Sequence, residues 1–466
     1  MNYLLIITSG ILYILPFFNP NLYFFSWFAF IPFLFSIHNE SYENLFSKGW
    51  LLGFIIVSGV GYPLYFPIKS FSNFNFFILL IILVILFSLL SLIYGIWGKI
   101  LELILNKKSF NPLYFSISWL SLEIIRHIIL NFFPLGYLGY TQANFNPIIQ
   151  IADIGGVFLL SFIIVLINAL IFKFLIAKKR RYIIISLLIV GLVLSYGFYR
   201  IDEYENIQAN INIGIIHTYI NQSEKWNRSN KEKYIDLFIS KDKQFENVNL
   251  IITPESALTF DINRETYYRN QILEKIEENN KYYQVGFLAT KNDSENYFNS
   301  TYLINQEGEI TNRYNKNKLL LFGEYVVFSD LIKKVTGYSL NTLNPGKEIV
   351  NFQTPFAKWK TVICSEILYP EFVSKNLNQL DFIVNQSNEA WFEDNSTLKN
   401  QMLASLVLRA VENRRSIIKA GNMTYSGIVY PSGKKEIFAN KTDKNLIIDV
   451  KINKENTIFN SLLNIQ

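Results

Sequence analysis

The hydrophobic and polar positions divide the chain into two parts with different patterns. The first 200 residues consist mostly of long apolar stretches that are separated by short polar loops. Most of these stretches approach or exceed the ~20 residues needed to cross ~30 Å of hydrocarbon, although the first two are short. Seven can be marked, over residues 3–18, 22–37, 49–68, 76–105, 111–133, 150–177 and 182–199. The pattern predicts a bundle of about seven transmembrane helices over residues 1–200.

After residue 200, short apolar segments alternate with polar helical ones. Strands are expected over residues 210–217, 249–254, 283–290, 361–364 and 381–386. Amphipathic helices are expected over 230–245 and 397–415, and hairpins over 302–314 and 428–438, which turn at Glu-Gly and Ser-Gly. Alternation of strands and helices predicts a layered α/β domain over residues 201–466.

The distribution of charge agrees with this division. Of the 80 charged residues (43 Lys and Arg plus 37 Asp and Glu), 17 lie in residues 1–200. The net charge of +6 is spread along the chain, and no basic stripe is interleaved with aromatic residues. A nucleic-acid partner is therefore not expected.

Basic residues in the loops predict the orientation in the membrane. Residues 178–181 are all Lys or Arg, and Lys107 and Lys108 separate the fourth and fifth spans, whereas the loop 134–149 has neither residue type. The positive-inside rule puts the basic loops and the N-terminus in the cytoplasm. Seven spans then put the chain after Arg200 on the outer face of the membrane. The first stretch has no basic residue ahead of it and no clear cleavage site, so we expect a retained span.

Several charged residues fall inside the predicted spans, among them Glu123, Arg126 and Asp153. Glu123 and Arg126 are spaced i, i+3 and can meet on one helix face, and Asp153 lies in the sixth span. One interpretation is ion pairing that holds the bundle together. The other is the lining of a cleft for a lipid headgroup or a substrate, because buried membrane charges are often functional.

The single cysteine, Cys364, raises the possibility of nucleophilic catalysis. It ends the apolar segment 361–364 and precedes a helix-compatible run, so free N–H groups and the helix dipole would favour its thiolate. One cysteine excludes an internal disulfide. Because the three histidines (His38, His127 and His217) are scattered along the chain, a metal site made of His and Cys ligands is not expected.

No histidine is placed to act as the base for this thiol, so a carboxylate must do so. Glu255 directly follows an apolar strand and a proline, and Lys316 follows the 302–314 hairpin. If the three strand ends cluster, Glu255 can take the thiol proton and Lys316 can stabilise an oxyanion. Taken singly, Glu255 and Lys316 are more typical of surface residues, and Cys364 is more typical of a buried structural cysteine.

Ordered motifs around these residues carry a family resemblance. The segments TPES (253–256), YNKNKLLLFGEY (314–325) and ICSEILYPEF (363–372) resemble the Glu–Lys–Cys motifs of the nitrilase, or carbon–nitrogen hydrolase, superfamily. NQSNEAWF (385–392) and RAVENRRSIIKAGN (409–422) are similar to the strand and helix that follow the cysteine. With PLGYLGYTQ (134–142), INQSEKW (220–226) and the membrane spans, nearly the whole chain resembles the apolipoprotein N-acyltransferases of bacterial inner membranes.

The resemblance implies an αββα nitrilase-like sandwich over residues 201–466 and a thioester acyl-enzyme. It implies Glu255 as general base, Lys316 as oxyanion stabiliser and Cys364 as nucleophile. Glu324 matches the family's second glutamate, which supports the lysine and the reacting carbonyl. Glu366 and Trp226 match further positions, which we expect to serve as a supporting residue and in substrate binding.

The chain departs from the family's pattern at positions that flank the triad. Thr253 stands where tryptophan is usual, Leu321 where proline is usual, Ser365 where an aromatic residue is usual and Glu389 where aspartate is usual. We expect these changes to affect how the substrate fits into the site more than they affect the catalytic reaction. The segment KINKENTIFNSLLNIQ also lacks an apolar stretch long enough for the family's eighth span, so either this member lacks that span or the sequence is truncated.

The expected function is transfer of a fatty acyl chain from phospholipid to the α-amino group of a lipoprotein's S-diacylglyceryl cysteine, without a cofactor or metal. The partners are then the phospholipid donor, the diacylated lipoprotein acceptor and the lipid bilayer. A membrane-tethered amidase or nitrilase acting on a small molecule is the alternative, and it predicts a closed polar pocket in place of an apolar channel. A third interpretation, a non-catalytic scaffold, conflicts with the presence of all three triad residues.

Overall fold

The computed structural model describes residues 2–38, 44–71, 74–205, 209–290, 297–320, 324–325, 343–393, 395–438 and 441–463. The contacts between Cα atoms divide the chain into two compact units. The helical unit contains Met1–Glu205, Asn395–Glu412 and Thr457–Ile465, and the α/β unit contains Asn206–Asp394 and Asn413–Asn456. Two segments from the C-terminal half of the chain therefore belong to the helical unit.

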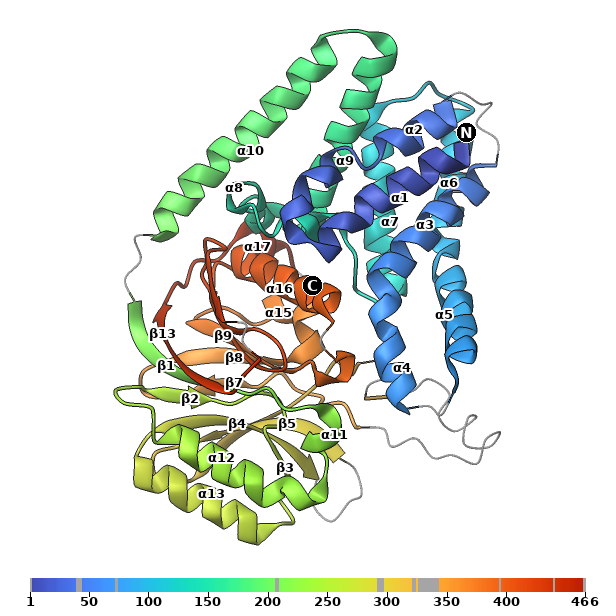
Figure 1. The fold of residues 1–466 in the computed structure, drawn as a ribbon. Coiled ribbons are helices and arrows are strands. Elements are labelled where there is room, and N and C mark those ends of the chain that lie inside the picture. Colours follow the sequence, from blue (N-terminus) through green and yellow to red (C-terminus); the bar gives the residue numbers. More distant parts are fainter. Residues whose placement is uncertain are drawn as a thin grey trace. The chain divides into compact units, whose positions relative to one another are not determined.

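The helical unit is built from apolar helices (Figure 1). Its α-helices are α1 (Asn2–Phe18), α2 (Ile31–His38), α3 (Leu45–Gly61), α4 (Tyr65–Phe71), α5 (Phe76–Leu90), α6 (Leu92–Leu105), α7 (Pro112–Ile129), α8 (Asn146–Ile149), α9 (Ala152–Ala177), α10 (Arg181–Glu205), α16 (Ser396–Asn413) and α17 (Ile458–Leu463). Its 3-10 helices are η1 (Pro20–Trp27), η2 (Tyr62–Leu64) and η3 (Leu138–Gln142).

Five helical stretches among the described residues are long and apolar enough to cross a membrane. They are Pro20–His38, Leu45–Ser70, Phe76–Leu105, Ala152–Ala177 and Arg181–Tyr204. The other two predicted spans are also helical but do not reach this standard. The stretch Tyr3–Phe18 is shorter, and α7 carries Glu123, Arg126 and His127, which reduce its apolar character.

Close helix packing in this unit depends on glycine. A Cβ atom added to Gly49 on α3 would lie 2.4 Å from the carbonyl oxygen of Tyr94, and one added to Gly98 on α6 would lie 2.1 Å from that of Leu45. Such contacts would force the two helices apart. Small residues therefore let α3 and α6 approach each other, as is common between helices in membranes.

Of the intramembrane charges, Asp153 on α9 forms an ion pair with Arg200 on α10 at 3.0 Å, which agrees with the ion-pairing interpretation. Glu123 and Arg126 do not pair with each other within the described residues. Glu123 Oε1 instead accepts hydrogen bonds from the Leu138 backbone N–H at 2.9 Å and from the Trp119 indole at 3.2 Å. Arg126 Nη1 donates to the Tyr94 hydroxyl at 2.8 Å. Leu138 is the first residue of η3, so its buried N–H has no partner within that helix, and the Glu123 carboxylate satisfies it.

The α/β unit is a sandwich of two sheets. Its helices and 3-10 helices are α11 (Gln222–Lys225), η4 (Arg228–Asn230), α12 (Lys231–Asp242), α13 (Thr266–Asn279), η5 (Cys364–Leu368), α15 (Pro370–Ser374) and η6 (Ala390–Phe392). The first sheet has the order β13-β1-β2-β4-β5-β6, with β3 beside β4, and the second has the order β12-β11-β10-β9-β8-β7.

The strands of the first sheet are β1 (Ala209–His217), β2 (Leu250–Ile252), β3 (Leu258–Asp261), β4 (Tyr282–Thr290), β5 (Tyr297–Ile304), β6 (Ile310–Asn315) and β13 (Lys444–Lys451). Those of the second are β7 (Asn351–Gln353), β8 (Lys358–Ile363), β9 (Phe382–Asn388), β10 (Ser416–Asn422), β11 (Ser426–Val429) and β12 (Lys435–Phe438). Both predicted hairpins are confirmed, and their turns contain Gly308 and Gly433 at positive φ.

The core of this unit fixes the position of the strand ends. Helices α12 and α13 cover the outer face of the first sheet (Figure 1), where Phe238 and Ile276 join a buried cluster with Phe287. Between the sheets, Gln284 on β4 donates to Gln386 Oε1 on β9 at 2.8 Å and accepts a hydrogen bond from Trp359 of β8. Because these buried amides are satisfied only by the opposite sheet, they set the register of one sheet on the other.

Candidate active site

Cys364 lies at the point where β8 ends and η5 begins. Its side chain is buried, with 6% of the residue exposed, and its backbone has a φ of +51°. This left-handed conformation is uncommon for a residue with a Cβ and occurs often at functional sites. The Asn385 side chain on neighbouring β9 donates to the Cys364 carbonyl at 3.2 Å and so supports the turn.

Glu255 follows β2 at the same end of the sandwich. Its two carboxylate oxygens accept 2.6 Å hydrogen bonds, Oε1 from the Asn299 amide and Oε2 from the Asn388 backbone N–H. The turn that carries Glu255 packs closely on β4, where a Cβ atom on Gly286 would lie 2.6 Å from the Pro254 carbonyl oxygen. The glycine therefore leaves room for this turn, and the two hydrogen bonds fix the carboxylate.

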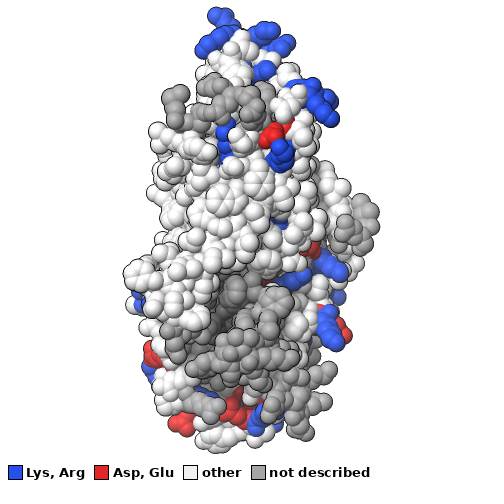
Figure 2. Space-filling model, turned by 90° about the vertical axis from the view of Figure 1, so that its right-hand side faces the viewer, with Lys and Arg blue, Asp and Glu red and all other residues white. Residues whose placement is uncertain are grey.

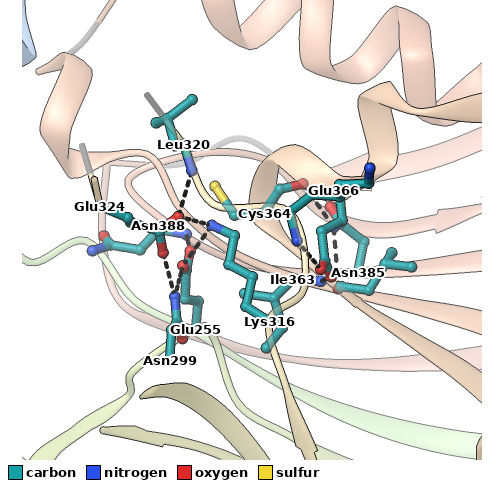
Figure 3. A network of polar contacts seen from close by, with 12 residues as sticks. Glu255, Asn299, Lys316, Leu320, Glu324, Ile363, Cys364, Glu366, Asn385 and Asn388 are labelled. Carbon is teal, nitrogen blue, oxygen red and sulfur yellow. Dashed lines mark hydrogen bonds and ion pairs between the residues drawn. The ribbon is translucent and has the colours of Figure 1, made fainter. Parts of the chain in front are cut away.

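Lys316 follows β6 and is 1% exposed. Its Nζ lies 2.6 Å from Glu324 Oε2 and 3.7 Å from Glu255 Oε1. Glu324 also accepts hydrogen bonds from the Leu320 N–H and from Asn299, each at 2.8 Å. Figure 3 shows Lys316 between the two carboxylates, with the Cys364 side chain nearby.

Glu366 is fully buried, and its carboxylate accepts hydrogen bonds from the Tyr314 hydroxyl and from backbone N–H groups, with no hydrogen bond to Lys316 or Cys364 within the described residues. Oε1 accepts from the N–H groups of Asn317 at 2.6 Å and Lys318 at 3.0 Å, and Oε2 accepts from the Ile363 N–H at 2.7 Å. One side chain thereby links the loop after Lys316 to the residue before Cys364 (Figure 3). These hydrogen bonds help to fix the distance between the Lys316 ammonium and the Cys364 thiol.

The electrostatics around Cys364 differ from the expectation based on the helix dipole. Burial, and then the negative charge of Glu255, raise the pKa of the Cys364 thiol far above its ordinary value. The expected depression of the pKa is wrong because η5 is a five-residue 3-10 helix and its small dipole cannot outweigh these effects. The resting site therefore holds a neutral thiol.

The other two groups have the charges that a base and an oxyanion stabiliser need. Burial lowers the pKa of Lys316, but the charges of Glu324 and Glu255 outweigh this effect and hold the pKa above its usual value. Burial raises the pKa of Glu255, while Lys316 opposes the rise. At neutral pH Lys316 is an ammonium, and Glu255 has greater proton affinity than an ordinary carboxylate.

Three residues that sequence reasoning did not identify complete the arrangement. Asn299 bridges Glu255 and Glu324, and Asn388 supplies a backbone N–H to Glu255. Lys225 is buried and donates from Nζ to the Glu255 carbonyl oxygen at 2.9 Å, and burial lowers its pKa to about 8. Lys225 directly precedes Trp226 in the INQSEKW motif, and this motif is the sequence feature that could have identified Lys225 as a site residue.

Trp226 and three of the four departures lie around these groups. Trp226 caps α11 beside Lys225, and its indole N–H has no partner within the described residues. Thr253 and Ser365 are buried next to Glu255 and Cys364, whereas Leu321 lies outside the described residues. Glu389 is buried and binds Lys419 at 2.7 Å, so its charge is largely compensated by a neighbour on β10.

The arrangement can perform covalent acyl chemistry. A thiol, a carboxylate of raised pKa and a cation lie close together in a buried site. These groups can serve as a nucleophile, its base and an oxyanion stabiliser. Among the described residues, no group of three or more His, Cys, Asp or Glu side chains could hold a metal ion.

Comparisons with known proteins identify both parts of the chain. Residues 9–170 match the apolipoprotein N-acyltransferase N-terminal domain, and residues 208–451 match the carbon–nitrogen hydrolase family. The apolipoprotein N-acyltransferase of Aquifex aeolicus is 30% identical over 92% of this chain and 93% of its own, and that of Geobacter metallireducens is 28% identical over 93% and 86%.

Among solved structures, an amidase from Nesterenkonia is 14% identical and has a TM-score of 0.41, over 53% of this chain and 93% of the amidase. The family models and the relatives agree on one assignment. The chain belongs to the apolipoprotein N-acyltransferase family, with a helical N-terminal membrane region and a C-terminal carbon–nitrogen hydrolase domain.

Proposed function

We propose that this enzyme transfers a fatty acyl chain from phospholipid, through a thioester on Cys364, to the α-amino group of the S-diacylglyceryl cysteine of an apolipoprotein. The observation that carries the proposal is the buried cluster of Lys316 with Glu255 and Glu324 beside the chain's single cysteine. In a member of this family, that cluster supplies a nucleophile, a base and a stabilising cation for two successive acyl transfers.

In the first half-reaction, Cys364 Sγ attacks the ester carbonyl carbon of the phospholipid and Glu255 takes the thiol proton. The carbonyl oxygen becomes an oxyanion, which the Lys316 ammonium stabilises. The intermediate collapses by breaking the ester C–O bond, and the alkoxide of the lysophospholipid leaves with the proton from Glu255. The products are a lysophospholipid and an S-acyl cysteine, and Glu255 is again ionised.

In the second half-reaction, the α-amino nitrogen of the diacylated lipoprotein attacks the thioester carbonyl. Lys316 stabilises the second oxyanion, and Glu255 takes a proton from the amine. Breaking of the C–S bond releases the amide product and a thiolate, which recovers its proton from Glu255. The raised pKa of the Cys364 thiol favours this return to the neutral form.

Burial supports a transferase over a hydrolase. A thioester exposed to water would hydrolyse, whereas Cys364, Glu255 and Lys316 are each less than a tenth exposed. A dry site also strengthens the attraction between the Lys316 ammonium and an oxyanion, because electrostatic interactions grow as the local dielectric constant falls. We assign Glu324 and Asn299 to positioning Lys316 and Glu255, and Trp226 to substrate binding.

The proposal includes an orientation in the membrane. The positive-inside rule puts the loops that contain Lys108 and Arg181 in the cytoplasm, and the α/β unit then lies on the periplasmic side. Donor and acceptor are both anchored in lipid, so they can approach along the bilayer.

A first prediction concerns the purified enzyme with phospholipid alone. We expect release of about one lysophospholipid per active site, followed by near arrest, because the acyl group remains on Cys364 until an amine arrives. A diacylated lipopeptide with a free N-terminal amine should restart turnover. Both phases can be followed by chromatography of lysophospholipid and lipopeptide.

The matched control is the same lipopeptide with an acetylated N-terminus, which should leave the reaction arrested. Steady release of free fatty acid without any amine would favour a hydrolase. Absence of lysophospholipid together with cleavage of a soluble amide would overturn the proposal in favour of a small-molecule amidase.

A second prediction concerns Asn299→Ala and the pH dependence of the acyl burst. Glu255 acts as a base when ionised, and its pKa is raised, so the acidic limb of the rate should lie above the ordinary glutamate value of about 4.3. Asn299 donates to the ionised form and lowers this pKa. Its removal should therefore move the acidic limb to higher pH.

Asn305→Ala serves as the control because Asn305 lies at the exposed turn of the same hairpin and contacts neither active-site carboxylate. It should leave the acidic limb unchanged. An unchanged limb in Asn299→Ala, with an unchanged melting temperature, would show that Glu255 is not the group whose ionisation controls the burst.

A further inference from the structure

A cavity of about 700 Å³ lies at one end of the helical unit, in a region without any of the active-site residues. Its walls come from three segments: residues 108–114 at the start of α7, the later part of α9, and the start of α10. Each segment contributes one cation, and these are Lys108, Lys173 and Arg181. No Asp or Glu is among the described lining residues.

The cations have no acidic partner within the described part of the chain. Lys173 Nζ donates to the Phe110 carbonyl at 2.9 Å, and Arg181 Nη2 donates to the Tyr182 hydroxyl at 2.9 Å. Lys108 Nζ lies 5.2 Å from the centre of the Tyr114 ring. These contacts orient the side chains but leave their positive charge uncompensated.

The N-terminus of α7 opens into the same cavity. Asn111 caps this helix by accepting a hydrogen bond from the Leu113 N–H at 2.8 Å, and both residues line the cavity. The positive end of an 18-residue helix therefore adds to the three side-chain charges. The combined field favours an anion, and a phosphate ester provides several acceptor oxygens for such a set of donors.

Apolar walls next to the cations indicate a lipid instead of a soluble anion. Leu166, Leu170, Ile185 and Ile189 line the same cavity as the three cations. A second cavity of about 680 Å³ between α6 and α7 shares Lys108 and Tyr114 with the first and is lined mainly by Ile and Leu, including Ile96. Two apolar grooves thus start from one cationic region, which suits one headgroup with two acyl chains.

The charge distribution on the helical unit is visible in Figure 2. Lys and Arg gather at the end that carries the turn between α9 and α10, above a wide band with few charges (Figures 1 and 2). A charged end next to an uncharged apolar band is the arrangement expected where a membrane helix reaches the headgroup layer.

We propose that this pair of cavities binds one anionic phospholipid, with its phosphate between Lys108, Lys173 and Arg181 and its acyl chains along the two apolar grooves. Basic pockets between membrane helices bind anionic headgroups in this way. An amine-containing zwitterionic headgroup fits less well, because the described lining offers no carboxylate for its ammonium. The lipid would bind at the cytoplasmic leaflet in the proposed orientation, away from the acyl donor at Cys364.

Native mass spectrometry of the full-length chain in detergent tests the proposal. The Cys364→Ala background prevents consumption of the lipid, and dioleoyl phosphatidylglycerol is compared with dioleoyl phosphatidylethanolamine, which has the same acyl chains. We expect one tightly bound phosphatidylglycerol and weaker binding of phosphatidylethanolamine. Each cation near a headgroup contributes about fivefold in affinity, so Lys173→Gln with Arg181→Gln should weaken phosphatidylglycerol binding roughly 30-fold.

Lys179→Gln with Arg180→Gln is the matched control, because it removes the same amount of charge from the turn between α9 and α10 without altering the cavity lining. It should change the affinity by less than about threefold. Lys108 lies at an exposed loop position, so Lys108→Gln should not disturb folding. This single variant should weaken phosphatidylglycerol binding about fivefold, and it tests the site if the double variant fails to fold.

Equal losses in the control and the cavity variants would overturn the proposal and indicate a general charge effect. Equal binding of the two lipids by the unaltered cavity would also contradict it. Full displacement of the lipid by a tenfold excess of glycerol 3-phosphate would show that the cavity is a site for soluble phosphate esters and not for a lipid.

Discussion

Cys364→Ala is expected to lower phospholipid-dependent acyl transfer by at least about 10,000-fold, because the thiol forms the covalent bond in both half-reactions. Substrate binding and the Lys316 ammonium remain, but they have no nucleophile to assist. Folding should be preserved, since the side chain is small and no hydrogen bond in the described structure depends on its sulfur. The measurement is the rate of lipopeptide N-acylation at equal amounts of folded, membrane-extracted protein.

Ser365→Ala provides the control at the neighbouring position. Ser365 is equally buried, and its hydroxyl has no partner within the described residues, so its removal should change the rate by less than about tenfold. Turnover by Cys364→Ala within about tenfold of the unaltered enzyme would exclude a covalent role for the thiol.

Lys316→Arg is expected to lower the rate of the acyl burst by about 100- to 1,000-fold although the positive charge is retained. Lys316 is almost fully buried, and its Nζ fits between Glu324 Oε2 and Glu255 Oε1. A guanidinium is larger and planar, so its N–H groups cannot occupy the position of a compact ammonium. The burst of lysophospholipid in the first turnover isolates the step concerned.

Lys318→Arg is the matched control two residues further on. Lys318 is half-buried and lies 5.5 Å from the centre of the Tyr369 ring, a contact that arginine can also make. Its burst should be close to normal. A normal burst in Lys316→Arg would remove Lys316 from the mechanism, whereas a loss that matches a fall in melting temperature would assign it a structural role.

The parts of the fold that were predictable from sequence are those fixed by local patterns. Long apolar stretches gave the membrane helices, and Gly308 and Gly433 marked both hairpin turns because a positive φ is easy for glycine. Strands β1, β4 and β9 were expected within about two residues of their observed ends. The weaker predictions were spans that carry charge, such as α7, where Glu123 and Arg126 reduce the hydropathy signal.

The remaining features depend on contacts between distant segments. Asn299 lies on β5, 44 residues after Glu255, and nothing in its local sequence indicates that it bridges two carboxylates. Glu366 was expected near the reacting groups, but its contacts with the Ile363 and Asn317 backbone could be recognised only in the folded chain. The raised pKa of the Cys364 thiol likewise follows from burial, which a sequence motif does not report.

The segments 395–412 and 457–465 illustrate a further limit. Helix α16 follows β9 in the chain and was expected to be part of the α/β domain, yet its residues up to Glu412 belong to the helical unit. Hydrogen bonds tie α16 to the helical unit, and one of them runs from the Val157 N–H to Glu412 Oε1 at 2.9 Å, at the kink in α9 beside Gly156. An unpaired N–H in a membrane helix needs such a partner.

The most direct test of the account is the location of the acyl group. The purified enzyme is incubated with a phospholipid of one defined acyl chain and no amine, and then digested and analysed by mass spectrometry without thiol reductants. The account predicts one acyl adduct, on the peptide that contains Cys364, which hydroxylamine removes at neutral pH and which a lipopeptide amine discharges. An adduct on another residue, or normal transfer to lipopeptide with no adduct on Cys364 at any time, would contradict the thioester mechanism.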